Sequence, residues 1–149
     1  MVIKVEKTVL RNLEQIRAKN ALKMAPRIEP GSGGSKTVAK EVPAMIVTDG
    51  FLGALAFAVE KAKGKDGKEV PKNPGHYSVF EAIRTHLNDP QMNLDVKSST
   101  VEDLLHDACE KWSADTLRAI TDEAMAYLNY LRRFAKPGKE EQSHDDDRA

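Results

Sequence analysis

SADTLRAITDEAMAYLNYLRRFAK, residues 113–136, is the stretch that decides the fold. Its apolar residues recur every three or four positions and so share one face of a helix: Leu117, Ile120, Ala124, Leu128, Leu131 and Ala135. Arg118, Asp122 and Arg133 fall on the opposite side. Basic residues in the last turn suit the negative end of the helix dipole, and Pro137-Gly138 stops the helix. We therefore predict a long helix that docks on other elements and ends in a basic cluster.

The N-terminal half of the chain is predicted to form three helices. The first covers about 8–24 and ends before Pro26, with an inward face made of Val9, Leu13, Ile16, Asn20 and Met24. Pro43 either kinks the second helix or begins it afresh, and this helix carries Val38, Val42, Met45 and Ile46. The third covers 51–63, with Asp49 as its candidate cap. Because its residues are apolar on all sides, we expect it to be the central, buried helix.

The C-terminal half is predicted to form a loop and three more helices. Residues 64–75 are rich in Lys, Gly and Pro, so we expect a mobile loop there. The next helix, about 77–87, is expected to bury Val79, Phe80, Ile83 and Leu87. Ser99 and Glu102 fit a capping box that starts a fifth helix, which presents Val101, Leu104, Leu105 and Ala108.

These patterns predict an all-α fold, a compact single-domain bundle of about six helices with long loops. We assign residues 1–138 to the helical domain and residues 139–149 to a disordered acidic C-terminal tail. A single cysteine, Cys109, predicts a reducing compartment. The N-terminus lacks the apolar core of a signal peptide, and no apolar run approaches membrane-spanning length. We therefore expect a soluble, cytoplasmic protein that contacts no membrane.

The charge of the chain is unevenly distributed. Its 23 Lys and Arg balance 23 Asp and Glu. Residues 1–40, however, carry nine basic residues against three acidic ones, and residues 81–123 carry four basic against ten acidic. Such a chain can bind a polyanion on one surface, or stack head to tail with its own copies or another subunit. Solvated helix faces that merely differ in sign would give the same counts.

A glycine-rich segment approaches a known phosphate-binding pattern. GSGGSKT, residues 31–37, differs from the phosphate loop because Ser35 stands where the pattern needs Gly. No buried strand is predicted before it, as such a loop requires. A flexible connector between helices explains the same residues, and a phosphate-loop enzyme is the weakest hypothesis.

The histidines and the cysteine give no convincing catalytic or metal site. His106 and Cys109 lie three apart on one predicted helix, but two ligands do not make a zinc site, and no third group orients them for catalysis. We predict that both are packing and surface residues. We also expect that His76, His86 and His144 form no constellation.

Adjacent carboxylates are interpreted as exposed decoration. Glu102 with Asp103, and Asp122 with Glu123, diverge around a helix because neighbours in sequence do not face each other. Neither a metal nor a cofactor is predicted, and no enzymatic activity follows from the sequence.

One surface pattern favours nucleic acid. Lys7, Arg11, Gln15, Lys19 and Lys23 are four residues apart, so they form a ridge on the first predicted helix. Four cations in a row can follow a phosphate backbone with salt-sensitive, sequence-independent binding. An ordinary solvated helix face explains the same spacing.

Three separated blocks together resemble one family. They are RAKNAL (17–22), then VPAMI running through TDGFL to ALAF (42–57), and a block from Arg118 through TDEA (121–124) to LRRFA (131–135). Their order and spacing are similar to those of the small subunit of the type III-B (Cmr) CRISPR RNA-guided effector complex.

The resemblance implies a small, non-catalytic helical bundle. Copies of it would form a minor filament beside the backbone subunits that hold the guide RNA, and would support the guide–target duplex. The implied partners are the backbone and large subunits, neighbouring copies, guide RNA and target RNA. Target cleavage would belong to the backbone subunits and nucleotide chemistry to the large subunit.

The predicted nucleic-acid contacts come from the two basic clusters. In such a complex base pairing reads sequence, while protein cations hold the backbone. The candidate residues are Lys7, Arg11, Arg17, Lys19, Lys23, Arg132, Arg133 and Lys136. Two alternatives stay open: Arg132 and Arg133 could instead contact acidic helices of a neighbouring subunit, and the whole chain could be a free-standing helical adaptor that binds protein and no nucleic acid.

Overall fold

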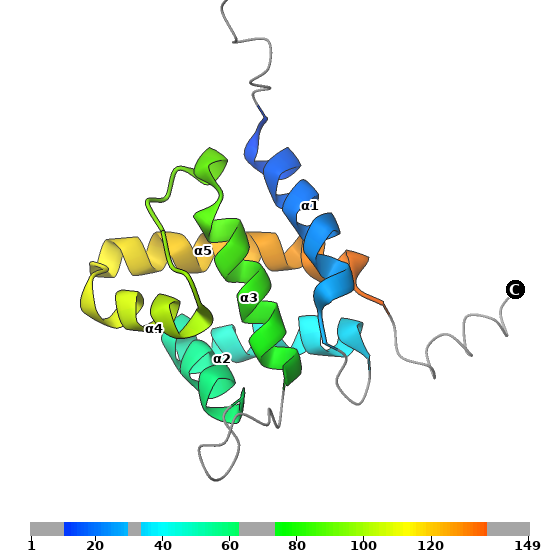
Figure 1. Cartoon of the computed structure of the whole chain (residues 1–149), viewed down its shortest axis with the longest axis horizontal. Helices are drawn as coiled ribbons and strands as arrows, with labels where there is room; N and C mark the ends of the chain where they lie inside the picture. The colour runs from blue at the N-terminus through cyan, green and yellow to red at the C-terminus, as the bar shows by residue number, and fades with distance from the viewer. Residues whose placement is uncertain (1–10, 30–33, 63–73, 137–149) are drawn as a thin grey trace, which may run out of the picture.

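The computed structural model describes residues 11–29, 34–62 and 74–136, which form five α-helices and two 3-10 turns (Figure 1). In chain order these are α1 (Leu13–Met24), η2 (Ala25–Arg27), α2 (Ser35–Ala62), α3 (Pro74–Asn88), η3 (Pro90–Met92), α4 (Val101–Glu110) and α5 (Ala114–Phe134). The described ranges contain no β-strand, so the predicted all-α fold is confirmed. The predicted tail, 139–149, and Lys7 lie outside the described residues.

The long C-terminal helix forms as its apolar pattern predicts. Ser113 caps α5, and its hydroxyl accepts a hydrogen bond from the Thr116 amide at 3.1 Å. The predicted face is buried from Ile120 to Ala135, whereas Leu117 is only half-buried. Both α1 and α3 pack across α5 (Figure 1), so this helix is the support on which the other elements are arranged.

The first helix begins later than predicted. Asn12 and Gln15 form a reciprocal capping box: the Asn12 side chain accepts from the Gln15 amide at 2.8 Å, and the Gln15 side chain accepts from the Asn12 amide at 3.0 Å. The predicted start near residue 8 is therefore wrong, because this box satisfies the first free amides of the helix. Leu13, predicted to face inward, is 47% exposed. Only Ile16, Ala21 and Met24 of α1 are buried.

α2 contains the two middle helices that the sequence predicts, joined at a sharp backbone break. Gly50 has φ 83° and ψ 163°, a conformation that residues with a Cβ rarely adopt. The break falls here and not at Pro43, which lies inside the helical stretch, so of the two alternatives at Pro43 the fresh start is excluded. Six predicted helices thus become five, with α2 made of two segments.

The apolar composition of α2 reflects core burial. By length and composition alone this helix could cross a membrane, so the expectation that no apolar run approaches that length is wrong. Nine of its residues are nevertheless buried among the other helices, and Gly50 interrupts it. The segment after the break, predicted to be buried on all sides, has an exposed side that includes Ala56. Small apolar residues such as alanine tolerate both environments.

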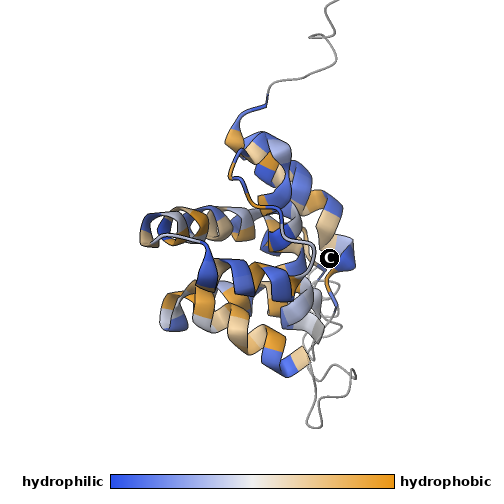
Figure 2. Ribbon diagram, turned by 60° about the vertical axis from the view of Figure 1, so that its left-hand side comes forward, coloured by the Kyte–Doolittle hydropathy of each residue, from blue (hydrophilic) through white to orange (hydrophobic). Residues whose placement is uncertain are grey.

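α3 occupies the centre of the bundle and contacts each of the other four helices. Its predicted core residues, Val79, Phe80, Ile83 and Leu87, are at most 1% exposed, which confirms that prediction. Figure 2 shows apolar and polar residues on different sides of the helices, as amphipathic packing requires. α3 begins at Pro74, so the predicted loop over 64–75 extends too far. Gly75 lets the start of α3 lie close to α2, because a Cβ at this position would be 2.9 Å from the Val38 side chain.

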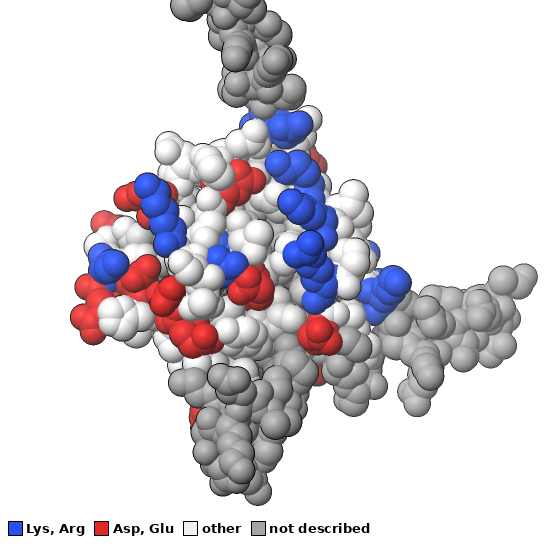
Figure 3. All heavy atoms as spheres, viewed as in Figure 1, with Lys and Arg blue, Asp and Glu red and all other residues white. Residues whose placement is uncertain are grey.

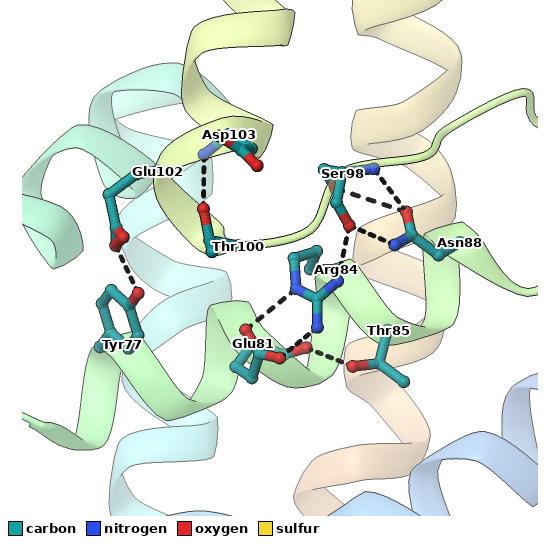
Figure 4. A network of polar contacts seen from close by, with 9 residues as sticks. All are labelled: Tyr77, Glu81, Arg84, Thr85, Asn88, Ser98, Thr100, Glu102 and Asp103. Carbon is teal, nitrogen blue, oxygen red and sulfur yellow. Dashed lines mark hydrogen bonds and ion pairs between the residues drawn. The ribbon is translucent and has the colours of Figure 1, made fainter.

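Polar side chains of α3 hold the segment that leads into α4 (Figure 4). The Ser98 carbonyl accepts from Arg84 Nη1 at 2.6 Å and from Asn88 Nδ2 at 2.5 Å. Thr100 then caps α4 and accepts from the Asp103 amide at 3.0 Å. The predicted cap at Ser99 is one residue too early, because α3 fixes the backbone at Ser98 and so sets where the helix begins.

Candidate nucleic-acid interface

A cluster of buried and half-buried polar groups fixes α1 on the body of the protein. Arg17 of α1 binds Glu123 of α5 through two hydrogen bonds, Nε to Oε2 at 2.8 Å and Nη2 to Oε1 at 2.7 Å. His86 of α3 lies 2.9 Å from the same Oε2 through its Nε2, and its ring stacks on Tyr127 with centroids 4.3 Å apart. We call Arg17, Asn20, His86, Asp89 and Glu123 the α1 clasp. It joins three helices through groups that burial would otherwise penalise.

The hydrogen bonds of the α1 clasp define where the His86 proton lies. The Asn20 amide nitrogen donates to Asp89 Oδ2 at 3.0 Å and lies 2.9 Å from His86 Nδ1. Because an ionised carboxylate only accepts, Asp89 orients the Asn20 NH₂ group toward both neighbours. His86 Nδ1 is then the acceptor, so the proton is on Nε2 and is donated to Glu123.

Glu123 is held as a carboxylate although its side chain is only 8% exposed. Burial acts to raise the pKa of Glu123, but the hydrogen bonds from Arg17 and His86, with the charge of Arg17, lower it to about 2 from an ordinary 4.5. Burial similarly acts to raise the pKa of Asp89, and the hydrogen bonds from Asn20 and the Gln91 amide, with the charge of Lys19, lower it. The ionised forms of both carboxylates are therefore part of the native fold.

Two predictions about single residues are wrong in this cluster. His86 was expected to form no constellation and Glu123 to be exposed, yet both are buried in the α1 clasp. One sequence signal was available, because each of the two lies on the apolar face of its helix. His86 follows Val79 and Ile83 on one face, and Glu123 lies between Ile120 and Tyr127 on another, and a polar residue at such a position needs a buried partner. The partners themselves are 37 to 106 residues distant in sequence, and no local pattern identifies them.

The α1 clasp gives Arg17 a structural role. Its side chain is 23% exposed and its guanidinium is occupied by Glu123. Arg17 and Asn20 come from the first block that carries the family resemblance, and Glu123 comes from the third. Part of that resemblance is therefore explained by how α1 attaches to the bundle. A contact of Arg17 with RNA stays a prediction.

The cations that α1 presents to solvent form what we call the α1 basic face: Arg11, Lys19, Lys23 and Arg27, all exposed. Figure 3 shows a column of Lys and Arg side chains along α1. Arg11 precedes the helix and Arg27 lies in η2, so the helical ridge predicted from residue 7 onward is shorter than expected. Arg27 was missed because Pro26 was expected to end the helix.

An open hollow of about 450 Å³ lies beside the α1 basic face, between α1 and α3. Lys19 and Lys23 line it together with Arg84 and Asp89. Arg84 is already bound to Glu81 and the Ser98 carbonyl. Lys19 is 47% exposed, although its ammonium lies 4.0 Å from Asp89, and Lys23 is also exposed. Both lysines can therefore still reach an anion.

A second basic surface lies where α5 ends. Arg133 and Lys136 are exposed, while Arg132 is half-buried and its Nε has no hydrogen-bond partner among the described residues. The Lys36 amide donates to the Lys136 carbonyl at 2.8 Å, which brings the start of α2 alongside. We call these four cations, with Phe134, the α5 corner.

The opposite side of the molecule is acidic. Asp and Glu gather around α4 (Figure 3), where Glu102, Asp103 and Glu110 are exposed. His106 and Cys109 are exposed on the same helix, which confirms their prediction as surface residues. Within the described ranges, no three His, Cys, Asp or Glu side chains gather as metal ligands would.

The glycine-rich segment is only partly described, because residues 30–33 lie outside the described ranges. Ser35 starts α2, and its hydroxyl donates to the Ile28 carbonyl at 3.0 Å. The Lys36 amide, which a phosphate loop would offer to its ligand, is already bound to the Lys136 carbonyl.

Comparison with known proteins identifies the family. The family model described as CRISPR-associated protein (Cas_Cmr5) matches residues 13–137, which include all three blocks quoted above. No curated protein and no solved structure matches the chain. Since the match covers most of the chain and every described helix, the protein belongs to the Cas_Cmr5 family and is a small subunit of the type III-B Cmr CRISPR complex.

Proposed function

We propose that this subunit is a non-catalytic scaffold that supports the guide RNA–target RNA duplex within the Cmr complex and so takes part in antiviral defence. Its α1 basic face holds phosphates of that duplex, and base pairing between the two RNAs reads the sequence. The backbone and large subunits perform the chemistry and contact this subunit, which acts in the cytoplasm.

The observation that carries the proposal is the separation of charge across the molecule. Exposed cations follow α1, whereas exposed carboxylates gather on α4. Because the total charge is zero, long-range attraction of the whole molecule to RNA is weak, and binding depends on which face is presented. A subunit that lies along a duplex with one face needs this arrangement.

The same polarity supports a minor filament of neighbouring copies. Head-to-tail stacking requires unlike surfaces at the two ends, because the contact is heterologous. The α5 corner of one copy and α4 of the next have opposite charge. In an assembled particle, Arg133 of one copy should cross-link to Asp103 of its neighbour if this end of α5 makes the contact. Cross-links from Arg133 to RNA alone would instead assign the α5 corner to nucleic acid.

The RNA-binding proposal is tested on the assembled complex. Lys19→Ala with Lys23→Ala should weaken binding of target RNA and lower the slope of log K against log salt concentration by about 1.4 to 1.8, since each phosphate contact accounts for about 0.7 to 0.9. The matched control is Lys97→Ala with Lys111→Ala, which removes the same charge from the acidic side.

The control pair should leave both affinity and salt slope unchanged. Equal effects of the two pairs would mean that only net charge matters, and no effect of the first pair would assign the α1 basic face to protein contacts. Either result would refute the proposed RNA-facing role of α1.

A further inference from the structure

The α5 corner holds an aromatic ring among cations. Phe134 is 39% exposed, although its neighbours Leu131 and Ala135 are at most 4% exposed. Tyr130 lies one turn earlier on the same side of α5, so two aromatic residues follow each other along the helix surface. Tyr130 is half-buried, and its hydroxyl interacts with Glu14 of α1. Phe134 is therefore the ring that this end of α5 presents to solvent.

The surroundings of Phe134 are positive. Arg132, Arg133 and Lys136 flank it in sequence, and the Lys36–Lys136 backbone bond adds the first turn of α2. The amino end of a helix carries partial positive charge, which adds to that of the side chains. Neither 132–136 nor 34–40 contains a carboxylate side chain, and Glu14 of α1 acts on Tyr130, one turn before Phe134. An anionic ligand with a flat apolar group fits this combination best.

We propose that Phe134 is a stacking platform for an unpaired base, so that the α5 corner binds single-stranded RNA with Arg133 and Lys136 on the adjacent phosphates. An aromatic ring bound to one base beside cations on the backbone is the usual arrangement for single strands. Bases inside an A-form duplex are already stacked on each other and cannot reach the ring. The inference rests on the proposed RNA-binding function and assigns a strand type to one part of it.

The test uses the full-length chain and fluorescence anisotropy with a labelled single-stranded RNA of about 12 nucleotides and a duplex of the same sequence. Phe134→Leu keeps an apolar side chain but removes the ring. It should weaken single-strand binding by about 5-fold to 150-fold, as loss of one stacked base does, and leave duplex binding unchanged. Phe134→Tyr keeps the ring and should bind as the wild type does.

Two further variants separate the effect of stacking from the effects of charge and of exposed apolar surface. Arg133→Ala should lower the salt slope for the single strand by about 0.7, whereas Phe134→Leu should leave that slope unchanged because no charge is lost. Val47→Ala removes an exposed apolar side chain, 76% exposed on α2, and should change neither affinity. Thermal unfolding of each variant confirms that the fold is intact.

Several results would overturn this inference. Unchanged single-strand affinity in Phe134→Leu, equal losses on both RNAs, or no binding of RNA by the wild-type chain would each do so. Loss of self-association without loss of RNA affinity would assign the ring to a neighbouring copy. The α1 basic face is judged independently, by the lysine pairs in the assembled complex, so failure of stacking leaves that proposal standing.

Discussion

Replacing Glu123 by Gln should destabilise the protein by an amount that depends on pH. The carboxyl pKa of about 2, against an ordinary 4.5, corresponds to about 3 kcal/mol of stability at neutral pH. Glutamine keeps the shape but turns one acceptor into a donor, which then faces a donor of Arg17 or His86. Glu123→Gln should therefore lower the free energy of unfolding by about 3 kcal/mol at pH 7, and the midpoint temperature by about 10 °C.

The pH dependence gives the sharper assay. Because the folded pKa is depressed, the Glu123 contribution is complete above pH 4.5 and is lost as pH falls toward 2. Urea unfolding of both proteins should give a difference of about 3 kcal/mol at pH 7 and about 1.4 kcal/mol at pH 3. Other carboxylates titrate in both proteins and cancel in the difference.

A mutant cycle with Arg17 supplies the control. Arg17→Met alone leaves the Glu123 charge buried without its strongest partner, so the double variant should cost less than the sum of the two single variants. A pH-independent difference between wild type and Glu123→Gln, or a difference below about 0.5 kcal/mol at pH 7, would refute this account of the α1 clasp.

Two further predictions concern the backbone. Gly50→Ala should cost about 1 to 3 kcal/mol in urea unfolding, because the backbone there is strained for a residue with a Cβ while no atom lies within 4 Å of the new methyl group; a neutral substitution would contradict the break in α2. Thr100→Ala should lower the free energy of unfolding by about 1 kcal/mol through loss of the α4 cap, whereas Ser99→Ala should be neutral. A larger loss from Ser99→Ala than from Thr100→Ala would instead support the capping box predicted from sequence.

Helix positions could be predicted from sequence because apolar periodicity is a local property. The buried faces of α3 and α5 follow from spacing alone, and both are confirmed except at Leu117, the first residue of the α5 face. Ends of helices were less predictable, since a cap such as Asn12 or Thr100 competes with good candidates one to four residues away. The place of a cap is settled by tertiary contacts, as the bonds from Asn88 to Ser98 illustrate.

The basic surfaces were predicted only in part, for a physical reason. Sequence spacing identifies cations that share a helix face, but it does not show which of them face a buried carboxylate. Arg17 and Lys19 are two residues apart, yet one is bound to Glu123 and the other is largely free to meet an anion. The meeting of Lys36 with Lys136 likewise depends on the packing of α2 beside α5.

The attachment of α1 has a consequence for its motion. α1 contributes three buried residues, whereas α5 contributes six, so apolar packing holds α1 on the bundle less firmly than it holds α5. Elements with few apolar contacts open at lower cost than the global unfolding free energy, and their amides exchange hydrogen earlier. α1 should therefore exchange before α3 and α5 in the free subunit. An anion bound across the α1 basic face would slow hydrogen exchange of the α1 amides. Binding at this surface would therefore make the helix that carries it more ordered.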